Sequence, residues 1–476
     1  MIVVLAITLA ALALRLVVAD ALPLIDTDGV AYVTIARQFQ ETGSPYHPVY
    51  HPLYPICIAL AQQFVGDWET AGRLVSALFG ALVILPAFVL ARAVVGRQAA
   101  ILAAVLIAVH PGLVLNSASV LCESTYTFLL VLGVLAGRRG LVGGPRSLVA
   151  LAGLLFGLAY LVRLEGAVYL AGLIVVAIFM IVKGRQRARD LLPWMGGAAL
   201  VFVVVAAPYL WYLTDAWGHF TPSGKIDHNF DLPIGVAAAP SPMPLRLVEN
   251  AFLFEKYALP ELLPGLLILL VLPGVLARTK TTGWLGRDGV LLGSALPPFA
   301  SIAFHIEPRI FLPVLPFILP FVAVGVLWTA VTVLDVRRAW RWSVVIVLLL
   351  ALALVPSALR PIVRPDEGAS LYRQAARWIA DTQPKDAVLL DRKPFIGFYS
   401  NRRWVPLPRV GPNELLAAAR RAGASLVVLD SRELPFDRPR LLPLLWGSPP
   451  PGLDVLRDFD AAPSDRLRIL VVTSRE

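Results

Sequence analysis

Two carboxylates near the beginning of the chain are the first candidates for chemistry. Asp26 and Asp28 follow an apolar run at residues 3–22, which is long enough to cross a bilayer. They are therefore expected at a membrane face, where a lipid-borne substrate is accessible. A carboxylate there can act as a general base or hold a divalent cation. In the simpler alternative, Asp28 is only the N-cap of an interfacial helix at residues 29–41, which carries Tyr32 one turn later.

A segment rich in proline, tyrosine and histidine follows at residues 46–55. His47 and His51 are four residues apart, but in a proline-rich loop this spacing does not make the helical pair that binds a metal. Aromatic rings and imidazoles in a rigid loop suit contact with a sugar or a lipid headgroup, so we predict that both histidines contact substrate. The alternative is that the prolines simply end one helix and start another.

Two further acidic positions lie beside apolar segments. Glu123 is at the outer end of a short apolar run. Because a carboxylate at the bilayer edge is costly unless it is paired or hydrated, we expect Glu123 to point into a cavity. Arg163 and Glu165 lie in the connection between two apolar runs, where they can either contact substrate or form a structural ion pair with each other.

A dense polar cluster lies between two long apolar runs near residue 307. It contains His305, Glu307 and Arg309. A guanidinium group stays charged and donates paired hydrogen bonds to anionic oxygens, so Arg309 suits a phosphate. In the alternative, Arg309 lies in a turn and extends its side chain to lipid headgroups.

The composition indicates what kind of protein must position these residues. Hydrophobic residues make up 58% of the chain and charged residues only 16%, with a mean hydropathy of +0.73. This is more apolar surface than a soluble domain can bury, so a polytopic membrane protein is predicted. The two cysteines, Cys57 and Cys122, show no metal-ligand spacing and are expected to be packing residues. The net charge of +10 falls in connections between apolar runs, so nucleic acid is not expected as a partner.

About eleven apolar segments have the composition of membrane spans. They lie at residues 3–22, 73–95, 98–115, 120–137, 148–162, 166–182, 192–213, 262–277, 289–305, 310–333 and 342–358. The first segment lacks a basic n-region and a convincing cleavage site, so we expect an uncleaved span rather than a signal peptide. The apolar stretch at residues 53–65 is short, and we expect a re-entrant or interfacial amphipathic helix there, in the first outer loop.

The basic residues are expected to set the orientation of these segments. They occupy every second connection, which predicts that those connections are cytoplasmic and that the acids and most histidines share the extracytoplasmic face. An odd number of spans with a cytoplasmic N-terminus leaves the C-terminal tail outside; if residues 53–65 cross the membrane, the N-terminus moves outside. The basic residues are Arg97, Arg138, Arg139, Arg146, Lys183, Arg185, Arg187, Arg189, Arg278, Lys280, Arg287, Arg337, Arg338 and Arg341.

The tail after residue 358 differs in composition from the rest of the chain, because charges become denser and apolar runs shorter. Helical spacing and strand-like patterns alternate along it. We therefore expect a membrane domain of residues 1–358 and an extracytoplasmic α/β domain of residues 359–476 with a partly parallel sheet. The expected helices lie at residues 370–380 and 413–422, and the expected strands at residues 387–391, 425–430 and 466–472.

The motifs together resemble the GT-C glycosyltransferases, in particular the bacterial branch that includes protein O-mannosyltransferases and lipid A aminoarabinose transferases. The resemblance covers roughly residues 1–335 and rests on the order and membrane side of the motifs. These are Asp28-Gly29-Val30-Ala31-Tyr32, His51-Pro52-Leu53-Tyr54-Pro55, Arg73-Leu74-Val75-Ser76-Ala77-Leu78-Phe79-Gly80 followed by Ala91-Arg92, Glu123, Arg163-Leu164-Glu165-Gly166 and Glu307-Pro308-Arg309-Ile310-Phe311-Leu312-Pro313. The family commonly has Asp-Glu in the first outer loop. Here Gly29 replaces the Glu, so Asp26 is the candidate for the role of the second acid.

The resemblance implies transfer of a sugar from a polyprenyl-phosphate donor to a lipid, glycan or protein acceptor on the extracytoplasmic face of a bacterial inner membrane, with inversion at the anomeric carbon. The catalytic candidates are Asp28 as general base, Asp26 and Glu123. A divalent cation is left open as a cofactor, because no ligand cluster has a diagnostic spacing and no metal ligand is assigned. The substrate-binding candidates are Tyr32, His47, His51, Arg163, Glu165, His305, Glu307 and Arg309.

Two other classes of function also place charges among many spans. A transporter or flippase of lipid-linked or small anionic substrates needs ionisable residues deep in its helices and broken helices in matching halves. Here the charges lie mainly at the outer edge and no repeated half is visible. A non-catalytic scaffold would bind partners through its outer domain and would tolerate the loss of Asp28. In an enzyme, the outer segment at residues 214–257 is expected to contribute to the choice of acceptor.

Overall fold

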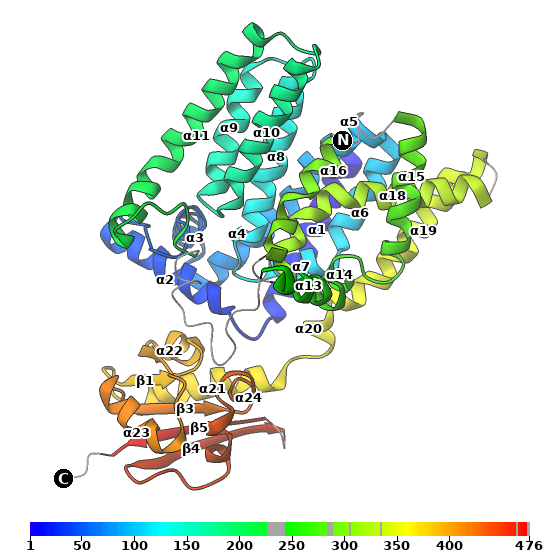
Figure 1. Ribbon diagram of the computed structural model, residues 1–476. Helices are drawn as coiled ribbons and strands as arrows, with labels where there is room; N and C mark the ends of the chain where they lie inside the picture. Colours follow the sequence, from blue (N-terminus) through cyan, green and yellow to red (C-terminus); the bar gives the residue numbers. More distant parts are fainter. Residues whose placement is uncertain (226–242, 283–288, 304–305, 334–335, 463–464, 474–476) are drawn as a thin grey trace. The chain divides into compact units, whose positions relative to one another are not determined.

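The chain forms two compact units (Figure 1). The computed structural model describes residues 1–476 except 226–242, 283–288, 304–305, 334–335, 463–464 and 474–476. The helical unit contains Met1–Asp20 and Tyr32–Arg360, and the C-terminal unit combines Ala21–Ala31 with Pro361–Glu476. The loop that holds Asp26 and Asp28 is therefore grouped with the C-terminal residues.

The helical unit consists almost entirely of helices. From the N-terminus these are α1 (Ile2–Ala21), α2 (Thr27–Thr42), α3 (Leu53–Val65), α4 (Trp68–Leu82), α5 (Ile84–Val95), α6 (Arg97–Val109), α7 (Pro111–Ala118), α8 (Glu123–Leu141), α9 (Ser147–Tyr160), α10 (Glu165–Val182) and α11 (Ala188–Trp217). They are followed by α13 (Met243–Leu253), the π-helix η1 (Phe254–Ala258), α14 (Leu259–Leu262), α15 (Leu267–Thr282), α16 (Gly289–Ala295), η2 (Pro297–Ala303), α17 (Pro308–Phe311), η3 (Leu312–Val314), α18 (Leu315–Val333), α19 (Val336–Ala358) and α20 (Arg360–Val363).

The helices confirm a multi-pass membrane protein, but the prediction of eleven spans is not confirmed. In the described part of the chain, six helical segments are long and apolar enough to cross a membrane, or eight if two bent helix pairs each count as one span. The six are Ile2–Ala21, Trp68–Val95, Glu165–Val182, Ala188–Trp217, Pro308–Thr332 and Ala339–Ala358.

The difference arises because hydropathy does not show where the backbone breaks. The run at residues 98–115 is divided between α6 and α7, which are bent by 49° where Pro111 begins the second helix. The run at 262–277 belongs to a pair bent by 89°. The runs at 148–162 and 289–305 correspond to the apolar helices Ser147–Tyr160 and Gly289–Ala300, whose 10–17 residues are short of the about 20 that a helix needs to cross a bilayer. The run at 120–137 forms α8, which begins at Glu123 and carries two arginines in its last turn. The short helix expected at residues 53–65 is present as α3.

Small residues allow neighbouring helices to approach closely. A methyl group at Gly153 in α9 would lie 2.3 Å from the carbonyl oxygen of Ala198 in α11. In α15 and α18, a methyl at Gly274 or Gly325 would likewise meet the backbone of the opposite helix, at 1.9 and 2.1 Å. Backbone contact through glycine is typical of membrane helices, where dispersion rather than the hydrophobic effect drives association.

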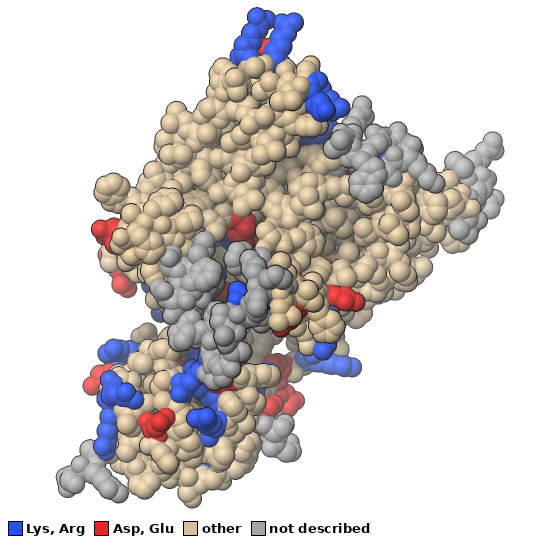
Figure 2. Space-filling model, in the orientation of Figure 1, with Lys and Arg blue, Asp and Glu red and all other residues tan. Residues whose placement is uncertain are grey.

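The surface of the helical unit is divided between apolar faces and a basic end. Large apolar side chains such as Leu200 and Trp211 in α11 are 64% and 81% exposed, as expected for contact with lipid. Figure 2 shows few charges along these helices and a group of basic side chains at one end. The connection between α10 and α11 and the first turn of α11 contribute to this group through the exposed side chains of Lys183, Arg185, Arg187 and Arg189.

The C-terminal unit is a five-stranded mixed sheet with the strand order β2-β1-β3-β5-β4. β1 pairs in parallel with β2 and β3, and β5 pairs antiparallel with β3 and β4. Its elements are α21 (Glu367–Thr382), β1 (Val388–Asp391), α22 (Phe395–Ser400), β2 (Arg403–Pro406), α23 (Pro412–Arg421), β3 (Leu426–Asp430), α24 (Leu434–Asp437), η4 (Pro439–Leu445), β4 (Leu453–Ala462) and β5 (Asp465–Val472).

The predicted partly parallel α/β domain is confirmed, although two strands were not predicted. β2 is only four residues long and ends in a proline. β4 is rich in charges because one of its faces is exposed. Two of its acids pair with arginines of β5, Asp458 with Arg468 at 2.8 Å and Asp460 with Arg466 at 2.7 Å. Both strands lie at edges of the sheet, where side chains are not required to be apolar.

Apolar side chains from the sheet form two layers. Leu389, Val428 and Ile469 pack with α21, and Leu390, Val427 and Leu470 pack with α23 and η4. The alternation of these residues along each strand places successive side chains on opposite faces.

Two buried acids end the neighbouring strands β1 and β3. Asp391 is 0% and Asp430 2% exposed. One oxygen of Asp391 accepts from the Lys393 backbone N–H at 3.4 Å, and one oxygen of Asp430 accepts from the hydroxyl of Tyr372 at 3.0 Å. Burial, and then the neighbouring Asp430 carboxylate, raises the pKa of Asp391 well above its usual range; burial also raises the pKa of Asp430.

This buried pair predicts that Asp391→Asn stabilises the protein at neutral pH. In the folded chain the two carboxyl groups keep their protons up to a higher pH than in the unfolded chain. The free energy of unfolding therefore falls as the pH rises from about 4, near the pKa of the unfolded chain, to the raised pKa of the folded chain. Asparagine cannot ionise, and we expect a gain of roughly 4 °C in Tm at pH 8 that shrinks toward pH 4. Thermal unfolding of the full chain in detergent measures this effect, with Asp454→Asn at an exposed position of β4 as the control. A lower Tm for Asp391→Asn at pH 8 would contradict the prediction.

Candidate active site

A network of ion pairs is centred on Glu123, the first residue of α8. Its side chain is 3% exposed. Arg163, in the turn between α9 and α10, places Nη1 3.0 Å from Glu123 Oε1 and Nη2 2.8 Å from Glu165 Oε1. The guanidinium group also lies 5.9 Å from the ring centroid of Tyr126. The predicted pair of Arg163 and Glu165 is therefore present, and it extends to an acid 40 residues earlier in the chain.

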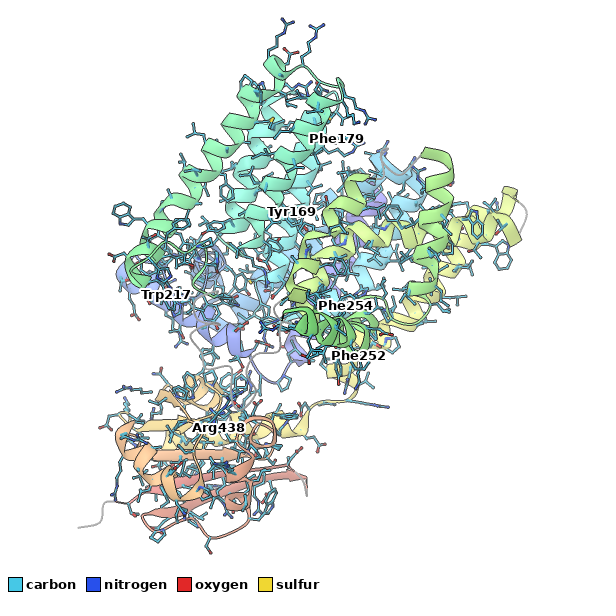
Figure 3. All side chains as sticks on the ribbon, viewed as in Figure 1. Tyr169, Phe179, Trp217, Phe252, Phe254 and Arg438 are labelled. Carbon is cyan, nitrogen blue, oxygen red and sulfur yellow. The ribbon has the colours of Figure 1, made fainter. Side chains whose placement is uncertain are left out.

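A second arginine approaches the same carboxylate. Arg309 Nε is 3.9 Å from Glu123 Oε1 and 2.6 Å from Glu307 Oε1. Glu307 has an extended backbone and precedes Pro308, which begins α17. Phe311 of the same short helix packs edge-to-face on Phe254 with ring centroids 4.8 Å apart, and Figure 3 shows Phe254 near α13. Residues from three distant parts of the sequence thus meet at Glu123.

The other oxygen of Glu123 faces a different environment. Glu123 Oε2 is buried and accepts no hydrogen bond from the described residues. Glu123 also lines a small cavity with polar side chains from α7 and α8 and apolar side chains around them. The lining residues are Gly80, Val83, Leu113, Asn116, Glu123, Ser124, Thr127 and Leu312. The expectation that Glu123 points into a cavity agrees with this geometry.

The proline-rich segment is fixed by hydrogen bonds to α11 and by aromatic packing. His47 Nδ1 accepts from the backbone N–H groups of Val49 and Tyr50 at 3.0 and 3.2 Å, which closes the turn. The hydroxyl of Tyr209 and the indole of Trp217, which Figure 3 labels at the end of α11, donate to carbonyl groups of this segment.

His51 is buried within this aromatic packing. It is 5% exposed, lies 4.9 Å from the ring of Tyr209 and 5.3 Å from that of Tyr160, and shares a hydrogen bond of 3.1 Å with Ser223. Burial lowers the pKa of His51 to about 4, so the imidazole is neutral at pH 7. Its contacts are those of a core residue that shapes the segment.

Tyr32 connects α2 to the element that carries Glu123. Its hydroxyl donates to the sulfur of Cys122 at 3.1 Å, and its ring packs edge-on against Tyr50 and Tyr54 at 5.2 and 5.0 Å. Tyr32 is 4% exposed. Cys122 packs in the interior as expected, and it directly precedes Glu123.

Asp26 and Asp28 belong to the C-terminal unit. The prediction that Asp28 is the N-cap of its helix is wrong, because α2 begins at Thr27 and Asp28 lies inside the first turn. The Asp26 carboxylate instead accepts from the Asp28 backbone N–H at 3.1 Å, and the Asp26 carbonyl accepts the first helical bond from Val30. Asp26 is therefore the N-cap of α2, the position at which a side-chain oxygen accepts a hydrogen bond from a free backbone N–H of the first turn.

Two remaining predictions concern His305 and a metal. His305 lies outside the described residues. Within the described residues, no group of three or more His, Cys, Asp or Glu side chains is arranged to hold a metal ion. A divalent cation therefore stays open as a cofactor.

Sequence reasoning missed a buried charge in the first span. Arg15 in α1 is 0% exposed and donates from Nη1 to the carbonyl oxygens of Ala11 and Ala108, both at 3.0 Å. Ala108 is in the last turn of α6, just before the break at Pro111. A charge inside an apolar run was the signal available, because such a residue needs a partner in the membrane. Arg15 supplies donors to carbonyl groups that the broken helix leaves unpaired.

The fold and one region of the sequence match known proteins. Residues 46–212 match the family model of dolichyl-phosphate-mannose-protein mannosyltransferase. The structure is similar to that of ArnT from Cupriavidus metallidurans, crystallised with undecaprenyl phosphate, at 16% identity and a TM-score of 0.61, covering 99% of this chain and 98% of that chain. It is also similar to the apo oligosaccharyltransferase of Archaeoglobus fulgidus, at 14% identity and a TM-score of 0.63, covering 90% of this chain and 69% of that chain. A comparison with curated protein sequences finds no match.

These findings define the class of protein. The chain is a multi-pass membrane protein with the fold of the GT-C glycosyltransferases, so the predicted resemblance is confirmed. Over residues 46–212 its sequence is also similar to the dolichyl-phosphate-mannose-protein mannosyltransferase family.

Proposed function

We propose that this protein transfers a sugar from a polyprenyl-phosphate donor to a hydroxyl group of a lipid, glycan or protein acceptor on the extracytoplasmic face of a bacterial inner membrane, with inversion at the anomeric carbon. The observation that carries this proposal is the meeting of two arginines on one buried glutamate, with Arg163 3.0 Å and Arg309 3.9 Å from Glu123 Oε1. In the related structures, ArnT binds undecaprenyl phosphate and the archaeal enzyme AglB binds a dolichol-phosphate with an inhibitory peptide.

The arginines are suited to the charge that the reaction creates. When the bond between the anomeric carbon and the phosphate oxygen breaks, the lipid phosphate leaves with an additional negative charge. Guanidinium groups held in place before the reaction stabilise that charge without rearrangement. Arg309 is bound to Glu307, which is 37% exposed, so Glu307 can move into solvent when a phosphate oxygen takes its place.

The acids carry the remaining steps. The acceptor oxygen bonds to the anomeric carbon as the phosphate leaves, and Asp28 accepts the proton of the acceptor hydroxyl. The transition state has oxocarbenium character, which the carboxylate of Glu123 stabilises electrostatically. Asp26 holds the Asp28 backbone through its side chain. The sugar lies beside the segment at residues 46–55, whose shape Tyr32, His47 and His51 help to fix through their contacts inside the protein.

A transfer assay with purified full-length protein in detergent tests this proposal. A panel of polyprenyl-phosphate sugars is supplied, with nucleotide sugars for comparison, and each reaction is run with and without a chelator. We expect consumption of one lipid donor with release of polyprenyl phosphate and no use of nucleotide sugars. Loss of transfer in chelator, with recovery on adding a divalent cation, would assign that cation as the cofactor. Failure of the folded protein to consume any lipid donor would contradict the proposal.

The role of Arg309 predicts a specific loss in the same assay. Arg309→Lys keeps the charge but loses the two-pronged donor geometry, so we expect donor turnover to fall about tenfold. Arg278→Lys is the matched control. Arg278 donates to the carbonyl oxygen of Val94 at 2.9 Å, and neither residue belongs to the ion-pair network of Glu123. Equal turnover in the two variants would remove Arg309 from phosphate binding.

A further inference from the structure

The loop before α2 is held by side chains that lie more than 300 residues later in the sequence. Residues Ala21–Ala31 cluster with Pro361–Glu476 as one compact unit, although the rest of residues 1–360 cluster separately. The contacts are of several kinds, and they involve successive residues of the loop up to the start of α2.

Three polar side chains of the C-terminal unit bind the loop. Arg373 in α21 donates from Nε to the carbonyl oxygen of Pro23. The hydroxyl oxygen of Tyr399 in α22 accepts from the backbone N–H of Ile25 at 2.7 Å. Both of these contacts, from Arg373 and from Tyr399, are to the backbone of the loop, so they fix its path without depending on its side chains.

The third contact reaches the first residue of α2. Lys393 Nζ donates to the hydroxyl of Thr27 at 3.3 Å and lies 3.9 Å from Glu433 Oε2. Lys393 follows β1 and Glu433 follows β3, so the lysine is held at the carboxyl ends of two parallel strands. Thr27 stands between Asp26 and Asp28.

Packing supports the same segment. Leu24 packs against the apolar cluster formed by α21 and one face of the sheet, and Ile25 is 2% exposed. Arg373 also lies over the ring of Tyr399, 4.2 Å from its centroid, so two of the binding side chains support each other. The loop is therefore part of the core of the C-terminal unit.

We propose that the C-terminal unit positions the catalytic acid, with Arg373, Lys393 and Tyr399 acting as a clamp on residues 23–27 that sets the place of Asp28. The inference rests on the proposed function, in which Asp28 is the general base. It assigns a role to the C-terminal unit, since a small displacement of a catalytic group costs a large part of the rate. These three side chains are positioning residues, because they act through the loop and not on the substrate.

Tyr399→Phe and Lys393→Met test the clamp in the full chain. We expect kcat to fall about tenfold to hundredfold with little change in KM for the lipid donor, because donor binding is left intact. Lys393→Arg should recover part of the lost rate, since arginine can still donate to Thr27. Tyr372→Phe is the matched control: it removes a hydroxyl that bonds to Asp430 within the same unit, and it should keep the wild-type kcat.

Hydrogen exchange gives a readout that does not depend on catalysis. The peptide covering residues 21–31 should exchange faster in Tyr399→Phe than in the wild type and in Tyr372→Phe, because Ile25 loses its acceptor. Unchanged exchange in Tyr399→Phe would overturn the clamp. Faster exchange with unchanged kcat would overturn the positioning role while leaving the proposed function intact. A wild type that consumes no donor would overturn the proposed function, whereas the exchange result would still decide whether the clamp exists.

Discussion

Replacing Asp28 with asparagine is expected to lower kcat for sugar transfer by about 10²- to 10⁴-fold, the contribution that a positioned general base usually makes. Asparagine has nearly the same shape but cannot accept the proton of the acceptor hydroxyl. The donor phosphate is assigned to arginines elsewhere in the chain, so KM for the lipid donor should change little. Initial rates over a range of donor concentrations separate these two parameters.

Asp26→Asn is the matched control for this experiment. Its side chain accepts from the Asp28 backbone N–H at 3.1 Å, and the amide oxygen of asparagine can accept the same bond. We therefore expect a much smaller loss of kcat than for Asp28→Asn. The reverse order of the two variants would assign the base to Asp26. If both variants keep the wild-type rate, neither acid takes part in proton transfer.

Arg163→Met is expected to destabilise the helical unit by about 3–5 kcal/mol, because it leaves a buried carboxylate without its partner. Glu123 is 3% exposed and Glu165 29%, so Glu123 suffers the larger loss of solvation. Arg309 compensates only in part, since its Nε is 3.9 Å from the shared oxygen. Thermal or denaturant unfolding in detergent measures this difference.

An exposed ion pair in the same unit provides the comparison. Arg189 is 75% exposed and lies 3.6 Å from Asp190, which is 51% exposed. Arg189→Met should change the stability by no more than about 1 kcal/mol. Adding Glu123→Gln to Arg163→Met should recover part of the lost stability, because it removes the unpaired charge. Similar stabilities for Arg163→Met and Arg189→Met would show that the buried network does not stabilise the helices.

The sequence predicted the positions of most helices, because about 20 apolar residues in a row are a strong signal. It did not predict the number of spans, since the break at Pro111 and the bend between α14 and α15 lie inside apolar runs. In the C-terminal unit, buried strands such as β1 and β3 were predicted from their apolar residues. The charged edge strand β4 was not, because only its pairing with β5 makes it a strand.

The candidate site was predictable to a similar extent. The pair of Arg163 and Glu165 is local, so the sequence could show it as one alternative. Its connection to Glu123 and Arg309 depends on how α8 packs beside α9 and on the turn before α18, which no local pattern contains. The helix α2 begins at Thr27 and not at residue 29, because the Asp26 side chain caps it. The sequence offers two aspartates two residues apart, and it does not decide which of them is the cap.

The C-terminal unit combines an early segment of the chain with a late one, and this has a consequence for the synthesis of the protein. The ribosome makes residues 21–31 more than 300 residues before their partners Arg373, Lys393 and Tyr399. During most of translation the segment with Asp28 is therefore inserted at the membrane without the contacts that fix it. Such long-range contacts form slowly because the intervening chain must first be ordered. A chain that stops before residue 361 completes its membrane helices without these contacts, so, with Asp28 as the proposed base, activity is expected only once Tyr399 has been made.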